Sequence, residues 1–132
     1  MKDVGVMCRN IVVADRNPRV RNLLKRELAS SGLKIRLAEN AGELLDIVYS
    51  RTPISLLVLD PDLPGIEDFN IFKRLKDRNP ALPIILHEIR GADTPLDLDD
   101  KTVLRIEKNG YSIEVLKKSI CELLKEAFSK PA

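Results

Sequence analysis

The chain has 132 residues, 44% of them hydrophobic, which predicts one globular domain with a single core. Its 22 basic and 20 acidic residues leave a net charge of +2, a balance that argues against a protein that coats nucleic acid. Two cysteines, one histidine and no tryptophan argue against a disulfide scaffold, a zinc knuckle or an aromatic platform for single strands. No apolar run reaches the length of a membrane span, and residues 1–10 do not resemble a signal peptide, so we expect a cytoplasmic protein.

The N-terminal quarter of the chain predicts a strand, a loop and a helix. Residues 11–14 are a short apolar run, as in a strand buried on both faces. Asn17 and Pro18 suit the cap and first turn of a helix that runs to about residue 31, and Gly32 suits its end. The apolar residues between them recur at helical spacing.

The next two units repeat this pattern. Residues 34–38 alternate as a strand does, and Asn40 is the expected cap of a helix whose apolar side extends to Tyr49. Residues 54–59 form the most strand-like run of the chain. We expect the helix that follows to include Phe69 on its apolar side, together with Ile71, Phe72 and Leu75.

The last part of the chain contributes two more strands, residues 83–86 and 102–106, and a final helix. Ser112 is the expected cap of that helix, which extends to about Phe128. Residues 91–100 should hold the fourth helix, but they contain a glycine, an interior proline and four aspartates. We therefore expect that helix to be short, displaced or missing.

Five strands that alternate with helices predict right-handed crossovers and a parallel sheet covered on both faces. The fold class is therefore α/β, a flavodoxin-like doubly wound five-stranded sheet in the order 2-1-3-4-5 with an irregular fourth helix. We expect residues 1–132 to form one domain with a core of about residues 9–127.

In such sheets ligands bind beyond the carboxyl ends of the strands, near the point where the strand order reverses. All the side chains that the sequence places at this end are charged. They are Asp15 and Arg16, Asp60 and Asp62, Glu88 after the fourth strand, and Lys108 after the fifth. We expect a functional site there.

Three stretches carry a resemblance to a known family: residues 11–18 (IVVADRNP), Asp60-Pro-Asp-Leu-Pro-Gly65 after the third strand, and Glu107-Lys108 before the last helix. Together they resemble the receiver domain of two-component response regulators, of the chemotaxis-regulator type, over about residues 9–127. The resemblance implies a signalling domain in a phosphorelay and not an enzyme.

The resemblance also implies a role for several residues. Asp60 would be the phosphoacceptor, whose carboxylate takes a phosphoryl group from a histidine kinase. Asp15, Asp60 and the backbone carbonyl of Asp62 would hold Mg²⁺. Lys108 would contact the transferred phosphoryl oxygens.

Three residues depart from the family's usual pattern. Arg16 replaces the second of two adjacent acids, so Mg²⁺ binding should be weak or absent. Glu88 replaces a hydroxyl residue that would bind the phosphoryl group, and Arg105 replaces an aromatic switch residue. We hypothesise that Arg16 pairs with Asp60 or Glu88 and takes the place of the metal, against the alternative that it points into solvent.

Two functions therefore compete. The first, which is our prediction, is a receiver that accepts phosphate weakly on Asp60 from a histidine kinase or phosphotransfer protein. The second is a pseudo-receiver that acts as an interaction module with little or no phosphorylation. In both, the signal passes to an unknown output protein, with no direct contact to nucleic acid or membrane, and a homodimer remains open. An enzyme or flavin carrier is disfavoured because the loop after the first strand has no glycine-rich phosphate cradle.

The remaining expectations concern His87 and the end of the chain. Strand alternation turns His87 away from Glu88, so we expect it to pack beneath a helix. The chain ends at Ala132, shortly after the last helix, which suggests a receiver without an output domain. Whether it is a stand-alone receiver or part of a longer regulator stays open.

Overall fold

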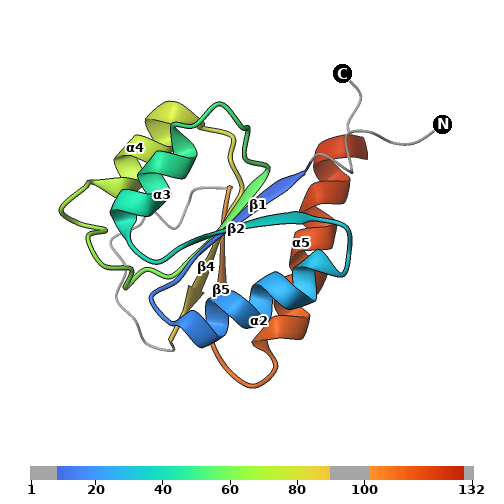
Figure 1. The fold of residues 1–132 in the computed structure, drawn as a ribbon. Helices are drawn as coiled ribbons and strands as arrows, with labels where there is room; N and C mark the ends of the chain where they lie inside the picture. Colours follow the sequence, from blue (N-terminus) through green and yellow to red (C-terminus); the bar gives the residue numbers. More distant parts are fainter. Residues whose placement is uncertain (1–8, 90–101, 130–132) are drawn as a thin grey trace.

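The computed structural model describes residues 9–89 and 102–129 (Figure 1). Within them, five parallel strands form one sheet in the order β2-β1-β3-β4-β5. The strands are β1 (Asn10–Ala14), β2 (Lys34–Ala38), β3 (Leu56–Leu59), β4 (Ile84–Glu88) and β5 (Val103–Glu107). The predicted fold class and strand order are confirmed.

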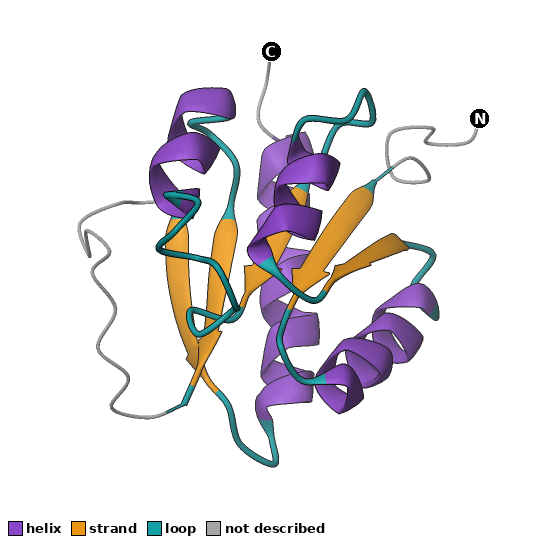
Figure 2. Ribbon diagram, turned by 60° about the vertical axis from the view of Figure 1, so that its left-hand side comes forward, coloured by secondary structure: helices purple, strands orange, loops and turns teal. Residues whose placement is uncertain are grey.

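Four helices in the described residues cover the two faces of the sheet (Figures 1 and 2). They are α2 (Pro18–Ala29), α3 (Ala41–Val48), α4 (Ile71–Arg78) and α5 (Ser112–Ser129). Helices α2 and α5 pack on one face, against Ile11 and Val13 of β1, and α3 and α4 pack on the other, against Val12 and Ala14. Because consecutive residues of a strand face opposite ways, the fully buried β1 supplies both cores.

Polar side chains begin two of the helices as predicted. The side chain of Asn17 accepts a hydrogen bond from the backbone N–H of Arg19, with Pro18 in the first turn, and Asn40 accepts one from Glu43. These bonds satisfy backbone donors that a helix leaves unpaired at its N-terminus. The first cap also fixes how the chain leaves β1, and this is where the site begins.

Three details of the predicted helices were wrong. Phe69 is not in α4 and is 43% exposed, because Asn70 takes a left-handed conformation (φ 52°) and the helix begins only at Ile71. Tyr49 follows α3 as its C-cap and is 49% exposed. Ser112 lies within α5, and its hydroxyl donates to the carbonyl oxygen of Asn109.

The strand boundaries also differ from those expected. Strand β3 begins at Leu56, two residues later than predicted, whereas β4 continues to Glu88. Glu88 is therefore the last residue of the strand and not part of the loop after it, because its backbone pairs with β5. The expected irregular helix at residues 91–100 lies outside the described residues. In the described part of the chain, no helix is both long and apolar enough to cross a membrane.

Candidate functional site

Two buried carboxylates lie side by side at the carboxyl end of the sheet. Asp15 follows β1 and is 2% exposed, and Asp60 follows β3 and is 1% exposed. The backbone N–H of Asp60 donates to the carbonyl oxygen of Ala14 at 2.8 Å, which ties the two strand ends together. Since β1 and β3 are neighbouring central strands, the sheet itself creates this pair of acids.

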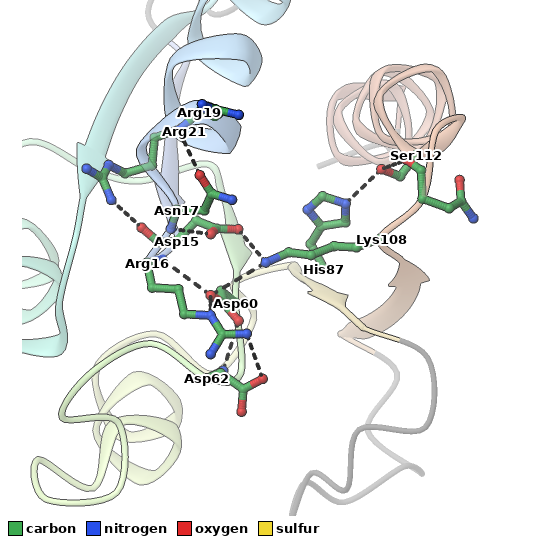
Figure 3. A network of polar contacts seen from close by, with 11 residues as sticks. Asp15, Arg16, Asn17, Arg19, Arg21, Asp60, Asp62, His87, Lys108 and Ser112 are labelled. Carbon is green, nitrogen blue, oxygen red and sulfur yellow. Dashed lines mark hydrogen bonds and ion pairs between the residues drawn. The ribbon is translucent and has the colours of Figure 1, made fainter.

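Both oxygens of Asp15 are hydrogen-bonded or ion-paired (Figure 3). Oδ1 accepts from the backbone N–H of Asn17 at 2.8 Å, and Oδ2 lies 3.0 Å from Nζ of Lys108. Burial nevertheless raises the pKa of Asp15, since these bonds and the ammonium only partly offset the loss of solvent. The nearby Asp60 charge acts in the same direction as burial.

Both oxygens of Asp60 are also engaged. Oδ1 accepts from the backbone N–H of Asp62 at 2.9 Å. Oδ2 accepts from the backbone N–H of Arg16 at 3.2 Å and lies 3.5 Å from both Nε of Arg16 and Nζ of Lys108. Two cationic side chains therefore meet at one oxygen of the predicted phosphoacceptor (Figure 3).

Arg16 lies across two acids. While its Nε faces Asp60, its Nη2 lies 3.5 Å from Oδ2 of Asp62. The side chains of Arg16 and Asp62 are 44% and 51% exposed, whereas Asp60 is buried. Of the two pairings that we hypothesised, the structure has the one with Asp60. The alternative in which Arg16 only points into solvent is not what the structure shows.

Glu88 pairs instead with Arg105. Nη1 of Arg105 lies 3.1 Å from Oε1 and 2.9 Å from Oε2 of Glu88. In the β4–β5 register Leu86 is opposite Arg105 and Glu88 is opposite Glu107, so Glu88 and Arg105 are diagonal neighbours on one face of the sheet. Two of the three departures from the family pattern thus form one ion pair.

The backbone of Glu88 also helps to place Lys108. Its carbonyl oxygen accepts a hydrogen bond of 2.7 Å from the backbone N–H of Lys108. The Lys108 side chain is only 16% exposed and reaches both buried aspartates. A chain of polar contacts therefore runs from the end of β5 through Lys108 to Asp15 and Asp60. Asp60 is in turn paired with Arg16.

His87 lies beneath α5, as its position in the strand predicted. It is 2% exposed, and its Nε2 lies 3.0 Å from the hydroxyl oxygen of Ser112 at the start of that helix. Burial, helped by the nearby Lys108 charge, lowers the pKa of His87 to about 4. A neutral imidazole therefore borders the charged cluster (Figure 3).

The site contains one residue that sequence reasoning missed. Arg21 of α2 donates from Nη1 to the backbone carbonyl oxygen of Asp15 at 2.7 Å, and its Nη2 lies 3.4 Å from Oε2 of Glu39. Its place in the first turn of α2 was the available signal, because helical side chains point back toward the N-terminus. Arg21 thereby fixes the chain just after β1.

Carboxylate oxygens are the ligands that Mg²⁺ prefers, and Asp15 and Asp60 bring such oxygens to this edge of the sheet. All four oxygens of Asp15 and Asp60 already have N–H or ammonium partners. Two positive side chains also stand beside Asp60, where the ion's charge would be repelled. Among the described residues, no group of three or more His, Cys, Asp or Glu is placed to hold a metal.

The chain belongs to the response regulator receiver domain family, whose model matches residues 11–95. It is 38% identical over 81 residues to the DNA-binding transcriptional regulator NtrC of Escherichia coli K12 and likewise to that of Salmonella typhimurium. The aligned part is 61% of this chain and 17% of the E. coli protein. The family is one of signalling domains in two-component systems.

Solved structures agree with this assignment. The response regulator TrrA of Thermotoga maritima, in complex with Mg(2+)-BeF, is 28% identical with a TM-score of 0.71, covering 87% of this chain and 98% of that one. A complex of the histidine kinase ThkA with TrrA matches with 27% identity and a TM-score of 0.70, covering 88% of this chain and 98% of that one.

Proposed function

We propose that this chain is a receiver module that signals through protein contacts and whose Asp60 site is held by its own side chains, with weak or absent Mg²⁺ binding and little phosphorylation. The observation that carries the proposal is the meeting of Arg16 and Lys108 at Oδ2 of Asp60, each at 3.5 Å. We take this geometry as support for the pseudo-receiver hypothesis over the predicted receiver that accepts phosphate weakly on Asp60.

The reason is electrostatic. A guanidinium about 4 Å from a divalent cation costs up to about 8 kcal/mol at an effective dielectric constant near 20. Arg16 is 44% exposed and can turn outward, which would reduce that cost but would also break its contacts with Asp60 and Asp62. Either way, binding of Mg²⁺ has to compete with an ion pair that is already formed.

The engaged carboxylate is also a poorer nucleophile. To accept a phosphoryl group, an oxygen of Asp60 must use a lone pair to form a bond to phosphorus as the bond to the donor breaks. The lone pairs of Oδ2 face a backbone N–H and two cationic side chains. Oδ1 accepts a hydrogen bond from the backbone N–H of Asp62. These contacts stabilise the unmodified carboxylate.

A second candidate function is weak phosphorylation of Asp60 by a histidine kinase or a phosphotransfer protein. It is favoured by Lys108, whose ammonium reaches the acceptor and would offset charge on an incoming phosphoryl group. The similarity to TrrA, which was solved in complex with a histidine kinase, suggests the same class of partner. In both functions we propose a cytoplasmic module, one domain over residues 1–132, that acts on an output protein and not directly on nucleic acid.

Intact mass after incubation with a small acyl phosphate and Mg²⁺ tests the proposal. We expect little single-phosphoryl adduct on the wild-type chain and much more on Arg16→Asp, which restores a second acid beside Asp15. Arg19→Asp is the matched control, because it makes the same charge change at an exposed position of α2. Adding Asp60→Asn to Arg16→Asp should remove the adduct.

Two results would contradict the proposal. Rapid and complete modification of the wild-type chain, lost in Asp60→Asn, would show that Asp60 accepts phosphate efficiently and would contradict the proposal. If Arg16→Asp gained no more adduct than Arg19→Asp, Arg16 would not be the obstacle.

A further inference from the structure

The peptide group between Asp15 and Arg16 lies just after β1, which runs between β2 and β3 in the sheet. The backbone N–H of Asp15 still donates to the carbonyl oxygen of Ala38, the last residue of β2, at 3.1 Å. Beyond this point β2 has ended, and the carbonyl oxygen of Asp15 accepts from Nη1 of Arg21 at 2.7 Å (Figure 3). A side chain of α2 thus continues the series of hydrogen bonds where the strand stops.

The same peptide group has a partner on its other side. Its N–H, which belongs to Arg16, donates to Oδ2 of Asp60 at 3.2 Å. The described part of the chain contains no cis peptide bond, and in a trans peptide the carbonyl and N–H groups point in opposite directions. A bond that holds the carbonyl oxygen toward Arg21 therefore also directs the N–H toward Asp60.

Arg21 is itself held from two sides. Its side chain is only 13% exposed, and its Nη2 lies 3.4 Å from Oε2 of Glu39, which follows β2. Because the guanidinium is planar and presents its donors in a fixed fork, these two contacts fix its orientation. A cationic donor at a carbonyl oxygen also polarises the peptide, since hydrogen bonds in a chain strengthen one another. The Arg16 N–H therefore becomes a better donor to Asp60.

We propose that Arg21 is a positioning residue, which acts through the peptide group between Asp15 and Arg16 and holds the Arg16 N–H on Asp60. The inference rests on the proposed function, in which Arg16 holds Asp60. The effect of Arg21 on Asp60 is indirect and passes through the backbone. It combines the direction that Arg21 gives to the peptide with the polarisation that its charge induces.

Amide NMR of the Arg16 N–H tests the inference directly. Arg21→Gln removes the charge and shortens the side chain, so the bond to the Asp15 carbonyl is lost. We expect hydrogen exchange at the Arg16 amide to rise about tenfold, since a charge-assisted bond to Asp60 is weakened. The carboxyl carbon signal of Asp60 should move in the same variant.

Two matched variants serve as controls. Arg19→Gln removes the same charge at an exposed position of α2. Glu39→Gln removes the ion pair of Arg21 but leaves its bond to the Asp15 carbonyl. Both should keep exchange at the Arg16 amide near the wild-type rate. A tenfold rise in either control would mean that general charge or the exposed pair is responsible, and it would overturn the inference.

A purely structural role for Arg21 predicts a different result. Arg21→Gln would then raise exchange at the Arg16 amide equally in the wild-type chain and in Asp60→Asn, or would only lower the melting temperature. Either outcome would overturn the inference, which requires a clearly smaller effect in the Asp60→Asn background. If Arg21→Gln does not fold, Arg21→Lys replaces it, because a lysine is shorter and lacks the fork. Exchange should rise in Arg21→Lys as well, and a wild-type rate would again overturn the inference.

The single variant Asp60→Asn separates this inference from the proposed function. If it leaves exchange at the Arg16 amide unchanged, Arg16 does not hold Asp60, and the proposed function loses its basis together with the inference. If Asp60→Asn raises the exchange but Arg21→Gln does not, the contact at Asp60 exists and only the positioning role of Arg21 is overturned.

Discussion

Arg16 presents two nitrogens to a single oxygen of Asp60: its backbone N–H donates to Oδ2 at 3.2 Å, and its Nε lies 3.5 Å from the same atom. One residue thus provides both a backbone donor and a charge. Its Nη2 extends to Asp62, so the planar guanidinium links a buried acid to an exposed one.

We expect Arg16→Asp to create a Mg²⁺ site. The change removes a positive charge and adds an oxygen ligand beside Asp15 and Asp60, so the affinity for Mg²⁺ should rise at least about tenfold. Titration with Mg²⁺ followed by amide NMR measures it, since the chain has no tryptophan. Arg19→Asp should leave the affinity at its wild-type value, and an equal gain in both variants would point to general charge.

Lys108→Met should destabilise the chain strongly. Two nearly buried carboxylates lose their shared ammonium, which should lower the free energy of unfolding by about 3 kcal/mol. Urea denaturation measures this loss. The control is Lys117→Met, which removes a partly exposed ion pair with Glu27. It should lower the free energy of unfolding by less than about 1 kcal/mol.

The Lys108 effect should depend on Asp60. The double variant Asp60→Asn/Lys108→Met lacks one of the two carboxylates that Lys108 contacts. Its loss in free energy of unfolding should therefore be smaller than the sum of the losses in the two single variants. Strictly additive losses would show that Asp60 and Lys108 do not interact.

His87 should make stability depend on pH. Its pKa falls from 6.5 in an unfolded chain to about 4 in the folded one, so below pH 6.5 the unfolded state binds a proton that the folded state does not. Its stabilising contribution is complete above pH 6.5 and is lost as the pH falls toward 4. By pH 5 the loss should be about 2 kcal/mol.

The comparison variant is His87→Gln, whose amide does not titrate. The difference in free energy of unfolding between wild type and variant, measured in urea at pH 7.5 and pH 5, should change by that amount. Asp15 titrates with the opposite sign, because its pKa is raised on folding, and this effect is common to both proteins. A difference independent of pH would mean that folding does not lower the pKa of His87.

Gly65, in the turn after Asp60, should not tolerate a side chain. Its φ is +86°, and an added Cβ would lie 3.2 Å from the ring of Phe69 and 3.3 Å from Cβ of Ala41. We expect Gly65→Ala to lower the free energy of unfolding by about 2 kcal/mol, because the left-handed backbone and the crowding both oppose a side chain. Thermal unfolding measures both variants: Gly32, with φ +83° and nothing within 4 Å of an added Cβ, should lose only about 1 kcal/mol of stability as Ala.

The sequence predicted the strands because a short apolar run, such as the fully buried β1, is local information. The strand order followed from the alternation of strands with helices, which is typical of this fold class. It misplaced Phe69 because aromatic spacing does not reveal that Asn70 adopts a left-handed conformation. It placed Glu88 in a loop because a charged residue rarely signals a strand, although the Lys108 N–H completes pairing at that point.

The sequence predicted most of the residues that meet at this end of the sheet but missed Arg21, and it predicted their contacts only in part. Asp15, Asp60 and Lys108 meet because parallel strands end together, which follows from the fold. That Glu88 pairs with Arg105 and not with Arg16 depends on the register of β4 and β5, in which Leu86 lies opposite Arg105. Register is set by tertiary packing, so no pattern in the sequence contained it.

The Glu88–Arg105 pair restricts how this sequence can change. A hydroxyl at position 88 would remove the carboxylate that Arg105 contacts, and an aromatic residue at position 105 would remove the cation that contacts both oxygens of Glu88. Each single step toward the usual family pattern is therefore disfavoured by the other residue, and the two substitutions are epistatic. Arg16 is under no such restraint, because its partners Asp60 and Asp62 are acids that the family pattern retains. A single substitution toward the usual family pattern is therefore least hindered at position 16.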